Sequence, residues 1–452
     1  MKKTATAIIG LGLSGEAAAE LLLREGAAVS VFDDREGPAQ QDRARRLSAR
    51  GAVVRLGGAA EDGWRGYEMV VVSPGIPPGH RLLVQARRAG VPVISEVELA
   101  SRFLSGRLVA VTGTNGKTTT VSLLVEIFRR AGRPAVAGGN IGYPLSRIAL
   151  EEKGEPVVVA EISSFQLENV ETFRPGTAVF LNLSPDHLDR YPSMREYGEA
   201  KLKIFARQGK GDRAVFPGKL SDFLAEAIPP GVEIITWGGP AGMARIEDGQ
   251  IRAYLPAGRR TVCPGEEIAR RGPAFLENAL AAAAAALAEG VGTEDIGEVL
   301  NSFPALPHRL EYLGKAGGVG FYNDSKSTNP AAAAAALEAF SRPVIWLAGG
   351  SDKGLDFSRI GPILPGPVKR VLLLGENREK LGRVVAGKVP FRYVSSLPEA
   401  VAEAFRAAES GDVILLSPGS ASFDMFENYR DRGDRFKALV RELTSGAGLR
   451  EA

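Results

Sequence analysis

The stretch VAVTGTNGKTTT, residues 109–120, joins an apolar strand candidate to a helical stretch through a short glycine-rich loop. Such a loop can present successive backbone N–H groups and a helix N-terminus to phosphate oxygens. Lys117 would then reach the β- and γ-phosphates, and the Thr118 hydroxyl would bind Mg²⁺. The strict G-x-x-x-x-G-K-[ST] pattern fails, because Val111 occupies its first position, and the shorter G-x-x-G-K-T starting at Gly113 remains. The stretch predicts an ATP-binding α/β domain.

On both sides of this loop, short apolar runs alternate with helical stretches, which is typical of βαβ units and parallel sheets. The runs are apolar on both faces, as expected for strands that helices cover on both sides. We expect strands at residues 5–9, 29–32, 69–72, 108–112, 157–162, 178–183, 344–347, 371–374 and 413–416. The chain is therefore predicted to be an α/β protein with mostly parallel sheets.

A length of 452 residues suggests three domains at about 150 residues each. A new strand and the glycine loop follow residues 93–105, and the proline-rich FPALP at 303–307 interrupts helix and strand alike. We expect a Rossmann-like domain at 1–97, a central P-loop ATPase-like domain at 98–304 and a second Rossmann-like domain at 305–452. Residues 229–272 are rich in glycine and proline, and we expect them to form a peripheral hairpin region of the central domain.

The composition excludes several classes of protein. Lys and Arg number 56 against 53 Asp and Glu, a net charge of +3 that lacks the excess expected of a nucleic-acid-binding protein. We interpret the basic stretch 43–50 as the solvated face of a helix. The single cysteine, Cys263, excludes an intramolecular disulfide and fits a reducing cytoplasm. No run of about 18 apolar residues predicts a membrane span, and the apolar stretch near the N-terminus is too short for a secretory signal.

A second glycine motif, GLGLSG at residues 10–15, follows the first strand candidate, and Asp33 ends the next strand about 20 residues later. This is the dinucleotide-binding pattern, in which the acid binds a ribose hydroxyl. The motif alone leaves three readings open: an NAD enzyme, a tight structural turn, or a site for another diphosphate nucleotide such as a UDP-sugar. An NAD enzyme has no use for an ATP loop, so the two motifs together favour a nucleotide-bearing substrate.

Two further side chains point to a divalent metal ion near the ATP loop. Glu161 lies at the carboxyl end of a predicted strand, and His187 follows another within the segment 182–191. Carboxylate and imidazole at two neighbouring strand ends suit a metal ion that bridges phosphate and substrate.

Lys201 shares the apolar face of a helix, predicted to begin after Ser193, with Tyr197, Ile204 and Phe205. The pattern favours a lysine that extends its amine out to solvent. The alternative is a buried neutral amine, which can react with CO₂ to form a carbamate and so become an anionic metal ligand.

Together these residues resemble the Mur ligases over essentially the whole chain. The loop beginning at Gly113 is shared with the folylpolyglutamate synthases, whereas EISSFQLE at 161–168 resembles the D-glutamate-adding branch of the Mur ligases. Further matches are GGNIG at 138–142, DHLDRYP at 186–192 and GEAKL at 198–202. In the last third of the chain, the matches are PHR at 307–309, NDSKSTN at 323–329, GGSDKG at 349–354 and SPGSASF at 417–423.

The resemblance implies an ATP-dependent ligase that adds D-glutamate to UDP-N-acetylmuramoyl-L-alanine in the cytoplasmic stage of peptidoglycan synthesis. The reaction would pass through an acyl phosphate and a tetrahedral intermediate. It further implies two Mg²⁺ ions, with Mn²⁺ as a substitute, a carbamate on Lys201, and a monomer whose domains close on the substrates.

The resemblance also implies roles for individual residues. Catalytic roles fall to Lys117, Asn140, His187 and Lys201. ATP would be bound by Gly113, Thr114, Asn115, Gly116, Lys117, Thr118, Thr119, Asn278, Arg309, Asp324 and Lys326. The UDP-substrate would be bound by Leu13, Ser14, Asp33, Asp34, Arg35, Ser73, Gly75 and Asn140. D-Glutamate would be bound by Thr328, Lys353, Ser422, Phe423 and Tyr429. The metal ligands would be Thr118, Glu161, His187 and Lys201.

Three positions in this set need comment. The family usually has His-Asn shortly before the asparagine that corresponds to Asn278, but this chain has Ala274 and Phe275, which leaves the adenine contacts open. Tyr429 stands where the family often has Phe. Ser422 precedes a predicted helix at 423–430, whose N-terminus would suit a substrate carboxylate.

Two alternatives remain at the level of sequence. A folylpolyglutamate synthase would begin at the P-loop domain and lack the first 100 or so residues. An NAD-linked dehydrogenase or nucleotide-binding regulator would use the first glycine motif differently.

Overall fold

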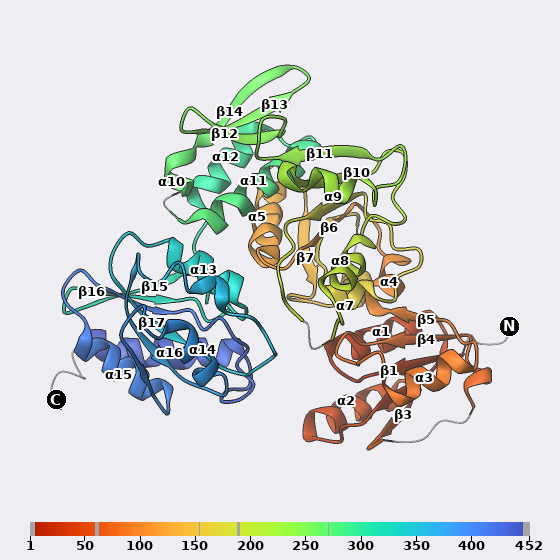
Figure 1. Ribbon diagram of the computed structural model, residues 1–452. Coiled ribbons are helices and arrows are strands. Elements are labelled where there is room, and N and C mark those ends of the chain that lie inside the picture. The colour runs from red at the N-terminus through yellow and green to blue at the C-terminus, as the bar shows by residue number, and fades with distance from the viewer. Residues whose placement is uncertain (1–4, 59–62, 153, 188–189, 270, 446–452) are drawn as a thin grey trace. The chain divides into compact units, whose positions relative to one another are not determined.

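The computed structural model describes residues 5–58, 63–152, 154–187, 190–269 and 271–445, whose strands form three sheets (Figure 1). Two compact units result. The first comprises Met1–Asn182, Arg195–Cys263 and Asn278–Leu300, and the second comprises Leu183–Met194, Pro264–Glu277 and Asn301–Ala452. The first unit contains the N-terminal sheet and the ATP loop, and the second contains the C-terminal sheet.

The N-terminal sheet is parallel throughout, in the order β3-β2-β1-β4-β5. Its strands are β1 (Ala5–Ile9), β2 (Ala28–Asp33), β3 (Val53–Leu56), β4 (Met69–Val72) and β5 (Val93–Ser95). Alternate β1 residues enter separate cores. Ile8 packs with residues of α1 (Leu13–Arg24) and α4 (Glu96–Ser101), and Ile9 packs with residues of α3 (Arg81–Arg88). Helices thus cover both faces, as in a Rossmann-like domain.

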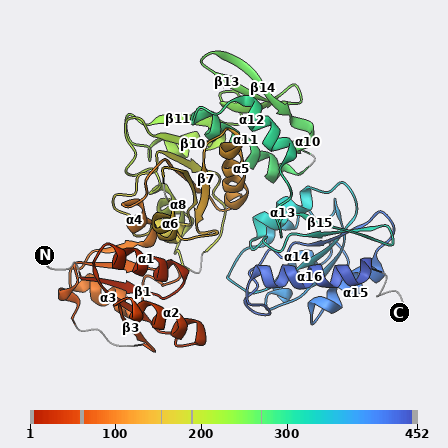
Figure 2. The same cartoon turned by 180° about the vertical axis from the view of Figure 1, so that it is seen from behind.

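The central sheet has nine strands in the order β14-β13-β12-β11-β10-β9-β6-β8-β7. Its parallel core consists of β6 (Leu108–Thr112), β7 (Ala135–Gly139), β8 (Val157–Glu161), β9 (Thr177–Phe180) and β10 (Arg213–Pro217). The remaining strands are β11 (Glu233–Trp237), β12 (Ala244–Glu247), β13 (Gln250–Leu255) and β14 (Gly258–Pro264). β12 and β13 pair in antiparallel fashion, and both views place this hairpin region far from the N-terminal sheet (Figures 1 and 2). The hairpin predicted within residues 229–272 is present at β12–β13, but the end of that range forms the helix α10 (Gly265–Ala269), which belongs to the second unit.

The C-terminal sheet has the order β15-β16-β20-β17-β18-β19, and β15 is its antiparallel edge strand. Its strands are β15 (Glu311–Ala316), β16 (Val319–Asn323), β17 (Val344–Ala348), β18 (Val368–Leu373), β19 (Phe391–Tyr393) and β20 (Val413–Leu416). One face packs against α13 (Pro330–Glu338) and α14 (Arg378–Val385). The other packs against α15 (Leu397–Ala407) and α16 (Tyr429–Thr444). The second Rossmann-like domain is therefore also present.

Two buried glutamates of α4 join the N-terminal sheet to the central one within the first unit. Glu98 accepts hydrogen bonds from the backbone N–H groups of Glu171, Thr172 and Phe173, at 2.8–3.0 Å. Glu96 accepts one from the Ser146 N–H at 2.6 Å, at the start of α6 (Leu145–Glu151). Residue 97, where the sequence suggested a domain boundary, thus lies inside α4. This helix packs in the core of the N-terminal sheet and also binds backbone N–H groups beside the central sheet.

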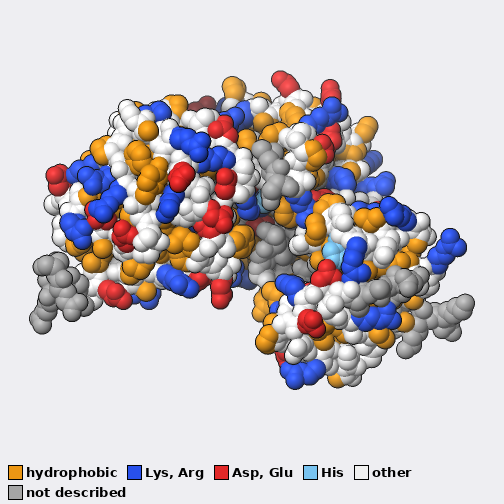
Figure 3. Space-filling model, turned by 60° about the horizontal axis from the view of Figure 1, so that its bottom comes forward, with side chains coloured by type: hydrophobic (Ala, Val, Ile, Leu, Met, Phe, Trp, Pro, Cys, Tyr) orange, Lys and Arg blue, Asp and Glu red, His pale blue; other side chains and the backbone are white. Residues whose placement is uncertain are grey.

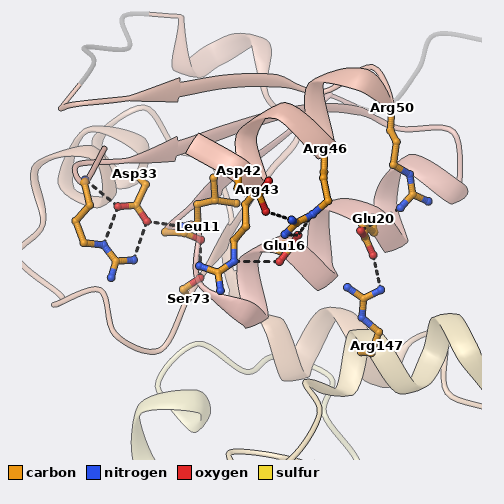
Figure 4. Close-up of polar contacts among 12 residues, drawn as sticks. Leu11, Glu16, Glu20, Asp33, Asp42, Arg43, Arg46, Arg50, Ser73 and Arg147 are labelled. Atoms are coloured by element: carbon orange, nitrogen blue, oxygen red, sulfur yellow. Dashed lines mark hydrogen bonds and ion pairs between the residues drawn. The ribbon is translucent and has the colours of Figure 1, made fainter. Parts of the chain in front are cut away.

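The basic stretch 43–50 lies mostly in α2 (Pro38–Ala49), as predicted, but it is not simply a solvated face. Arg43 and Arg46 bind the buried carboxylate of Glu16 on α1, and Arg50 binds Glu20 (Figure 4). Arg147 of α6 binds Glu20 from the central domain at 2.5 Å. These arginines are therefore part of the packing between α1, α2 and α6.

Basic and acidic side chains are interspersed over the face of the molecule seen in Figure 3, in line with the nearly balanced composition. Cys263 is buried at the end of β14. None of the helices in the described part of the chain combines the length and apolar character that a membrane span needs.

Candidate active site

The ATP loop lies between β6 and α5 (Lys117–Arg130), as predicted. Gly116 has a φ of 87°, which favours glycine, and a Cβ there would lie 2.1 Å from Oδ1 of Asn278. Asn278 belongs to α11 (Pro273–Ala288) and is buried. The structure therefore brings this predicted ATP residue against the loop, and any side chain at Gly116 would displace it.

Asn182 shapes the same loop and was missed in the sequence. Its backbone oxygen accepts a hydrogen bond from the Thr114 N–H at 3.0 Å, and its Oδ1 accepts one from the Asn115 N–H at 2.9 Å. Its Nδ2 donates to the Asn115 carbonyl oxygen at 3.1 Å. Two loop amides are thus held by Asn182. β9 ends at Phe180, three residues before the predicted end at residue 183.

Three predicted residues meet at the carboxyl ends of β6, β7 and β8. The Thr118 hydroxyl donates to Oε2 of Glu161 at 2.7 Å, and Nδ2 of Asn140 donates to Oε1 at 2.9 Å. Glu161 is 3% exposed. The arrangement places a buried carboxylate beside the hydroxyl that begins α5, at the edge where parallel sheets carry their ligand sites.

Lys117 and Lys201 both donate from Nζ to the carbonyl oxygen of Gly113, at 2.8 and 2.9 Å. Lys201 is 1% exposed, and its Nζ also lies 4.6 Å from the centre of the Tyr197 ring. The interpretation that Lys201 extends out to solvent is therefore wrong. The reason is that the amine of Lys201, in the last turn of α8 (Met194–Leu202), binds the ATP loop instead of solvent, on a helix face whose residues Tyr197, Ile204 and Phe205 are also buried.

In the N-terminal domain, the glycine loop and Asp33 lie at the carboxyl ends of β1 and β2. Oδ2 of Asp33 accepts from the Leu11 N–H at 2.6 Å and from Arg35, and Oδ1 accepts from the Arg35 N–H and Nε (Figure 4). Burial raises the pKa of Asp33, but the hydrogen bonds from Arg35 and Leu11 outweigh it and hold the pKa below its usual range. Asp33 therefore fixes the shape of the loop through contacts within the chain.

The other predicted UDP-substrate residues surround this loop. The Ser73 hydroxyl donates to the Gly10 carbonyl oxygen at 2.8 Å, which ties the end of β4 to the end of β1. Leu13 is 63% exposed at the start of α1. Asp34 is exposed, and its Oδ2 lies 2.9 Å from Nε2 of His80. His80 is a neighbour of the predicted site that the sequence did not single out.

In the second unit, the segment after β16 carries the predicted ATP residues Asp324 and Lys326. Burial raises the pKa of Asp324 to about 6, although the Ser417 hydroxyl and the Leu310 N–H both donate to it. Nζ of Lys326 lies 5.1 Å from the centre of the Tyr429 ring. Arg309 lies between His308 and Leu310, which both have positive φ, at 63° and 42°. This strained backbone sets the position of Arg309.

The predicted D-glutamate residues also meet in the second unit. Nζ of Lys353 lies 5.7 Å from the centre of the Phe423 ring, and Ser422 is buried beside it in the chain. The predicted helix at 423–430 is wrong, because α16 begins only at Tyr429. The Asn428 side chain accepts from the Arg430 and Asp431 N–H groups and so caps the helix there. Ser422 thus precedes a turn, not a helix N-terminus.

His187 belongs to the second unit, whereas Glu161 and Lys201 belong to the first. Its neighbour Asp186 accepts a hydrogen bond from Nδ2 of Asn329 at 3.0 Å. Leu188 and Asp189, which belong to the same sequence motif, lie outside the described residues. Across the described ranges, no three His, Cys, Asp or Glu side chains are grouped so as to hold a metal ion. A metal ion here would therefore need hydroxyl, water or phosphate oxygens as well.

Three family models match the chain. They describe a MurD-like N-terminal domain at residues 4–95, a Mur ligase middle domain at 111–286 and a Mur ligase glutamate ligase domain at 308–419. The chain belongs to the Mur ligase family. The match of a MurD-like N-terminal domain at residues 4–95 excludes the two alternatives considered from the sequence, a folylpolyglutamate synthase and an NAD-linked dehydrogenase or nucleotide-binding regulator.

The relatives point to one branch of this family. The chain is 42% identical to the UDP-N-acetylmuramoylalanine–D-glutamate ligase of Acidobacterium capsulatum, over 98% of each chain. It is 41% identical to the enzyme of the same name from Salinibacter ruber, over 98% of this chain and 99% of that one.

Solved structures of Mur ligases share the fold. MurF from Thermotoga maritima, in complex with ADP, matches with a TM-score of 0.61 and 19% identity, over 92% of this chain and 95% of that one. MurC from the same organism matches with a TM-score of 0.59 and 20% identity, over 98% and 99%.

Proposed function

We propose that this protein is an ATP-dependent ligase that joins D-glutamate to UDP-N-acetylmuramoyl-L-alanine, in the cytoplasmic stage of peptidoglycan synthesis. The observation that carries the proposal is the contact of Thr118 and Asn140 with the buried Glu161 beside the ATP loop. Full-length similarity to D-glutamate ligases at 41–42% identity supports the choice of substrates.

The reaction transfers the γ-phosphoryl group of ATP to the carboxylate of the alanyl residue, which gives an acyl phosphate and ADP. The amine of D-glutamate then attacks the acyl carbon, and the tetrahedral intermediate expels phosphate to leave the amide. Lys117 and the amides at the start of α5 offset the phosphate charge, while Gly113–Thr119 hold the triphosphate. Asn278, Arg309, Asp324 and Lys326 would complete the ATP site. Most of the catalysis is positioning and electrostatics.

The donor atoms at the ATP loop fit Mg²⁺. Thr118 supplies a hydroxyl oxygen and Glu161 a carboxylate oxygen, and Mg²⁺ commonly combines one or two such ligands with water and phosphate oxygens. His187 and a modified Lys201 are the further ligands we propose, with two ions in all and Mn²⁺ as a substitute. When bound, the metal would neutralise phosphate charge.

We further propose that Lys201 is carbamylated in the active enzyme. Its burial and its position beside the Lys117 ammonium, on the same carbonyl oxygen, both disfavour the charged form of the Lys201 amine. A neutral amine can add CO₂, and the resulting carbamate would carry a negative charge next to Lys117. The modification would therefore replace a repulsion with an attraction.

The three domains would divide the substrates among them, with boundaries at 1–97, 98–304 and 305–452. The UDP-substrate would bind the N-terminal domain through Leu13, Ser14, Asp33, Asp34, Arg35, Ser73 and Gly75, and reach Asn140. D-Glutamate would bind the C-terminal domain through Thr328, Lys353, Ser422, Phe423 and Tyr429. We expect a cytoplasmic monomer with no nucleic-acid partner.

The test is phosphate release from ATP with UDP-N-acetylmuramoyl-L-alanine and a panel of D- and L-amino acids. We expect release that depends on the nucleotide substrate and is fastest with D-glutamate. Equal rates with L-glutamate and D-glutamate, or release without the nucleotide substrate, would contradict the proposal. Omission of ATP provides the blank.

A further inference from the structure

A buried arginine lies in the first turn of α16, outside the residues assigned above. Arg432 is 2% exposed, and all three of its guanidinium nitrogens donate hydrogen bonds. Nε donates to the Ser325 hydroxyl at 3.0 Å, and Nη2 donates to the Ser325 carbonyl oxygen at 2.8 Å. Nη1 donates to the carbonyl oxygens of Ser420 and Ala421, at 3.1 and 3.4 Å. One planar side chain thus holds two separate segments.

These two segments carry different parts of the proposed site. Ser325 lies between Asp324 and Lys326, which we assign to ATP. Ser420 and Ala421 directly precede Ser422, which we assign to D-glutamate. Arg432 therefore joins the ATP segment to the amino-acid loop. It does so beside two direct contacts, from the Gly419 N–H to the Ser327 carbonyl oxygen at 2.9 Å and from the Ser417 hydroxyl to Asp324 at 2.8 Å.

The contact extends to a third segment. The Ala421 carbonyl oxygen also accepts from the Ser351 N–H at 2.9 Å, and the two residues form an isolated bridge. Ser351 lies two residues before Lys353. A Cβ on the neighbouring Gly350 would lie 2.1 Å from the Ala421 oxygen, so these backbones can approach only because residue 350 is glycine. A shift at Ser420 and Ala421 would therefore also move the Lys353 loop.

Within the described residues, no carboxylate forms an ion pair with Arg432, whose acceptors are carbonyl oxygens and one hydroxyl. Burial lowers the pKa of Arg432 to about 9, against the opposing effect of Asp424 and Asp324. The guanidinium is still charged at neutral pH. A buried cation without a paired anion is costly, unless its hydrogen bonds fix a geometry that the protein needs.

We propose that Arg432 is a positioning residue that sets the amino-acid loop relative to the ATP segment, and so couples D-glutamate binding to ATP binding. The inference rests on the proposed function, because the two segments owe their roles to it. Arg432 is buried, and its donors are taken up by Ser325, Ser420 and Ala421, so we do not expect it to touch ATP or D-glutamate. A change at Arg432 should therefore weaken the binding of ATP and D-glutamate and leave the binding of the UDP-substrate unaffected.

The test compares Arg432→Ala and Arg432→Lys with Arg435→Ala as the matched control. Arg435 lies one turn later on α16, is exposed, and pairs with Asp431. We expect Arg432→Ala to raise the KM for D-glutamate and for ATP about tenfold or more, because a charged donor to three carbonyl oxygens is lost. The KM for the UDP-substrate and all constants of Arg435→Ala should stay within about twofold of the wild type.

Two measurements separate positioning from general stability. Added guanidinium should lower the two raised KM values of Arg432→Ala, because it can occupy the vacated space and donate to the same oxygens. Arg432→Lys keeps the charge but cannot reach both segments, so it should fold and still show raised KM values. A fall in kcat with unchanged KM values in both variants would indicate a purely structural role and overturn the proposal.

Amide hydrogen exchange provides a test that needs no substrate. We expect faster exchange in residues 419–424 and 324–327 of both Arg432 variants than in the wild type, and no such change in Arg435→Ala. Unchanged exchange in those segments would overturn the inference. If instead the wild-type protein releases no phosphate with D-glutamate, the proposed function fails, while the exchange comparison still decides whether Arg432 holds the two segments.

Discussion

Lys117 and Lys201 are 84 positions apart in the numbering, yet their amines bind the same oxygen, that of Gly113. Lys117 begins the helix of the ATP loop, and Lys201 lies in the last turn of α8. Two ammonium groups on one buried acceptor repel each other, and the carbamate proposed above would replace that repulsion with an attraction. The Lys201 amine is the one that is almost fully buried, which makes it the candidate for modification.

Lys201→Ala should therefore be nearly inactive and should recover part of its activity in acetate, whose carboxylate can take the place of the carbamate. Lys201→Arg should not recover, because its guanidinium is always charged and fills the space. Activity with and without acetate measures this, and native mass spectrometry of the wild type should detect the CO₂ adduct. A fully active Lys201→Ala would contradict the carbamate proposal.

Lys117→Ala should abolish ligation and leave binding of the UDP-substrate within about threefold of the wild type. The reason is that the loss removes a positive charge from the phosphate site, while the proposed UDP-substrate residues lie in the N-terminal domain. Isothermal titration with the UDP-substrate, together with the phosphate assay, measures both effects. Loss of UDP-substrate binding in a folded variant would mean that the domain roles are wrong.

Glu161→Gln should lower kcat/KM about 100-fold and raise the Mg²⁺ concentration needed for half-maximal activity. Glutamine keeps the size of the side chain, but it removes the charge that the metal would need. Exposed Glu152, in the same domain, gives the control variant Glu152→Gln. A Mg²⁺ titration that superimposes on that of the wild type would exclude Glu161 as a ligand.

Lys353→Ala should raise the KM for D-glutamate far more than the KM for ATP. The expected loss is about 1.5–3 kcal/mol, the value of a hydrogen bond to a charged group. Lys388 is an exposed lysine whose Nζ donates to the Val384 carbonyl oxygen, and Lys388→Ala provides the control. Equal increases in both KM values for Lys353→Ala would refute the assignment of Lys353 to D-glutamate.

Glu96 predicts a pH-dependent stability. Burial raises its pKa from 4.5 to about 7, against the hydrogen bonds from Ser146. The folded state therefore holds a proton that the unfolded state has lost between about pH 4.5 and 7, so this group lowers the free energy of unfolding as the pH rises through that range. Glu96→Gln should be more stable than the wild type at pH 8, by on the order of 2–3 kcal/mol, and show no advantage at pH 4.

Glu98 lies two residues after Glu96 on the same helix, and its pKa is shifted in the opposite direction. Burial raises its pKa, but donors from Thr172, Glu171 and Arg102 outweigh burial and lower it. The stability that it contributes is present above the unfolded pKa and is lost as the pH falls through the folded pKa. Glu98→Gln should therefore be destabilised at pH 8. Urea unfolding of both variants at pH 4 and pH 8 measures the two signs, and the same sign for both would contradict this reading.

The sequence predicted the central strands of the sheets because these strands are buried on both faces, whereas strands such as β3, β15 and β19 were not predicted. The run 108–112 became β6 and 413–416 became β20 with the predicted bounds. A continuous apolar run of this kind can be recognised as a buried strand from its composition alone. The helix predicted at 423–430 was wrong because Asn428, five residues after its predicted start, caps α16 and decides where that helix begins.

The sequence predicted those residues of the candidate site that belong to a sequence motif, and it missed those that do not. Thr118, Glu161 and Asn140 stand in recognisable motifs, and the structure brings them together. Asn182 and Arg432 act through long-range contacts with backbone oxygens and amides, which leave no local pattern. The sequence around Arg432 also contains Arg430 and Arg435, and nothing in the spacing reveals which of the three is buried.

The burial of Cys263 has a practical consequence. A thiol introduced at an exposed position would be the one that reacts readily with a maleimide dye, because the native thiol is shielded. Exposed Ser48 in the first unit and exposed Glu379 in the second are suitable positions for a pair of cysteines. Donor and acceptor dyes at these two positions would test, through energy transfer, whether the substrates move the two units relative to each other, with the native cysteine left in place.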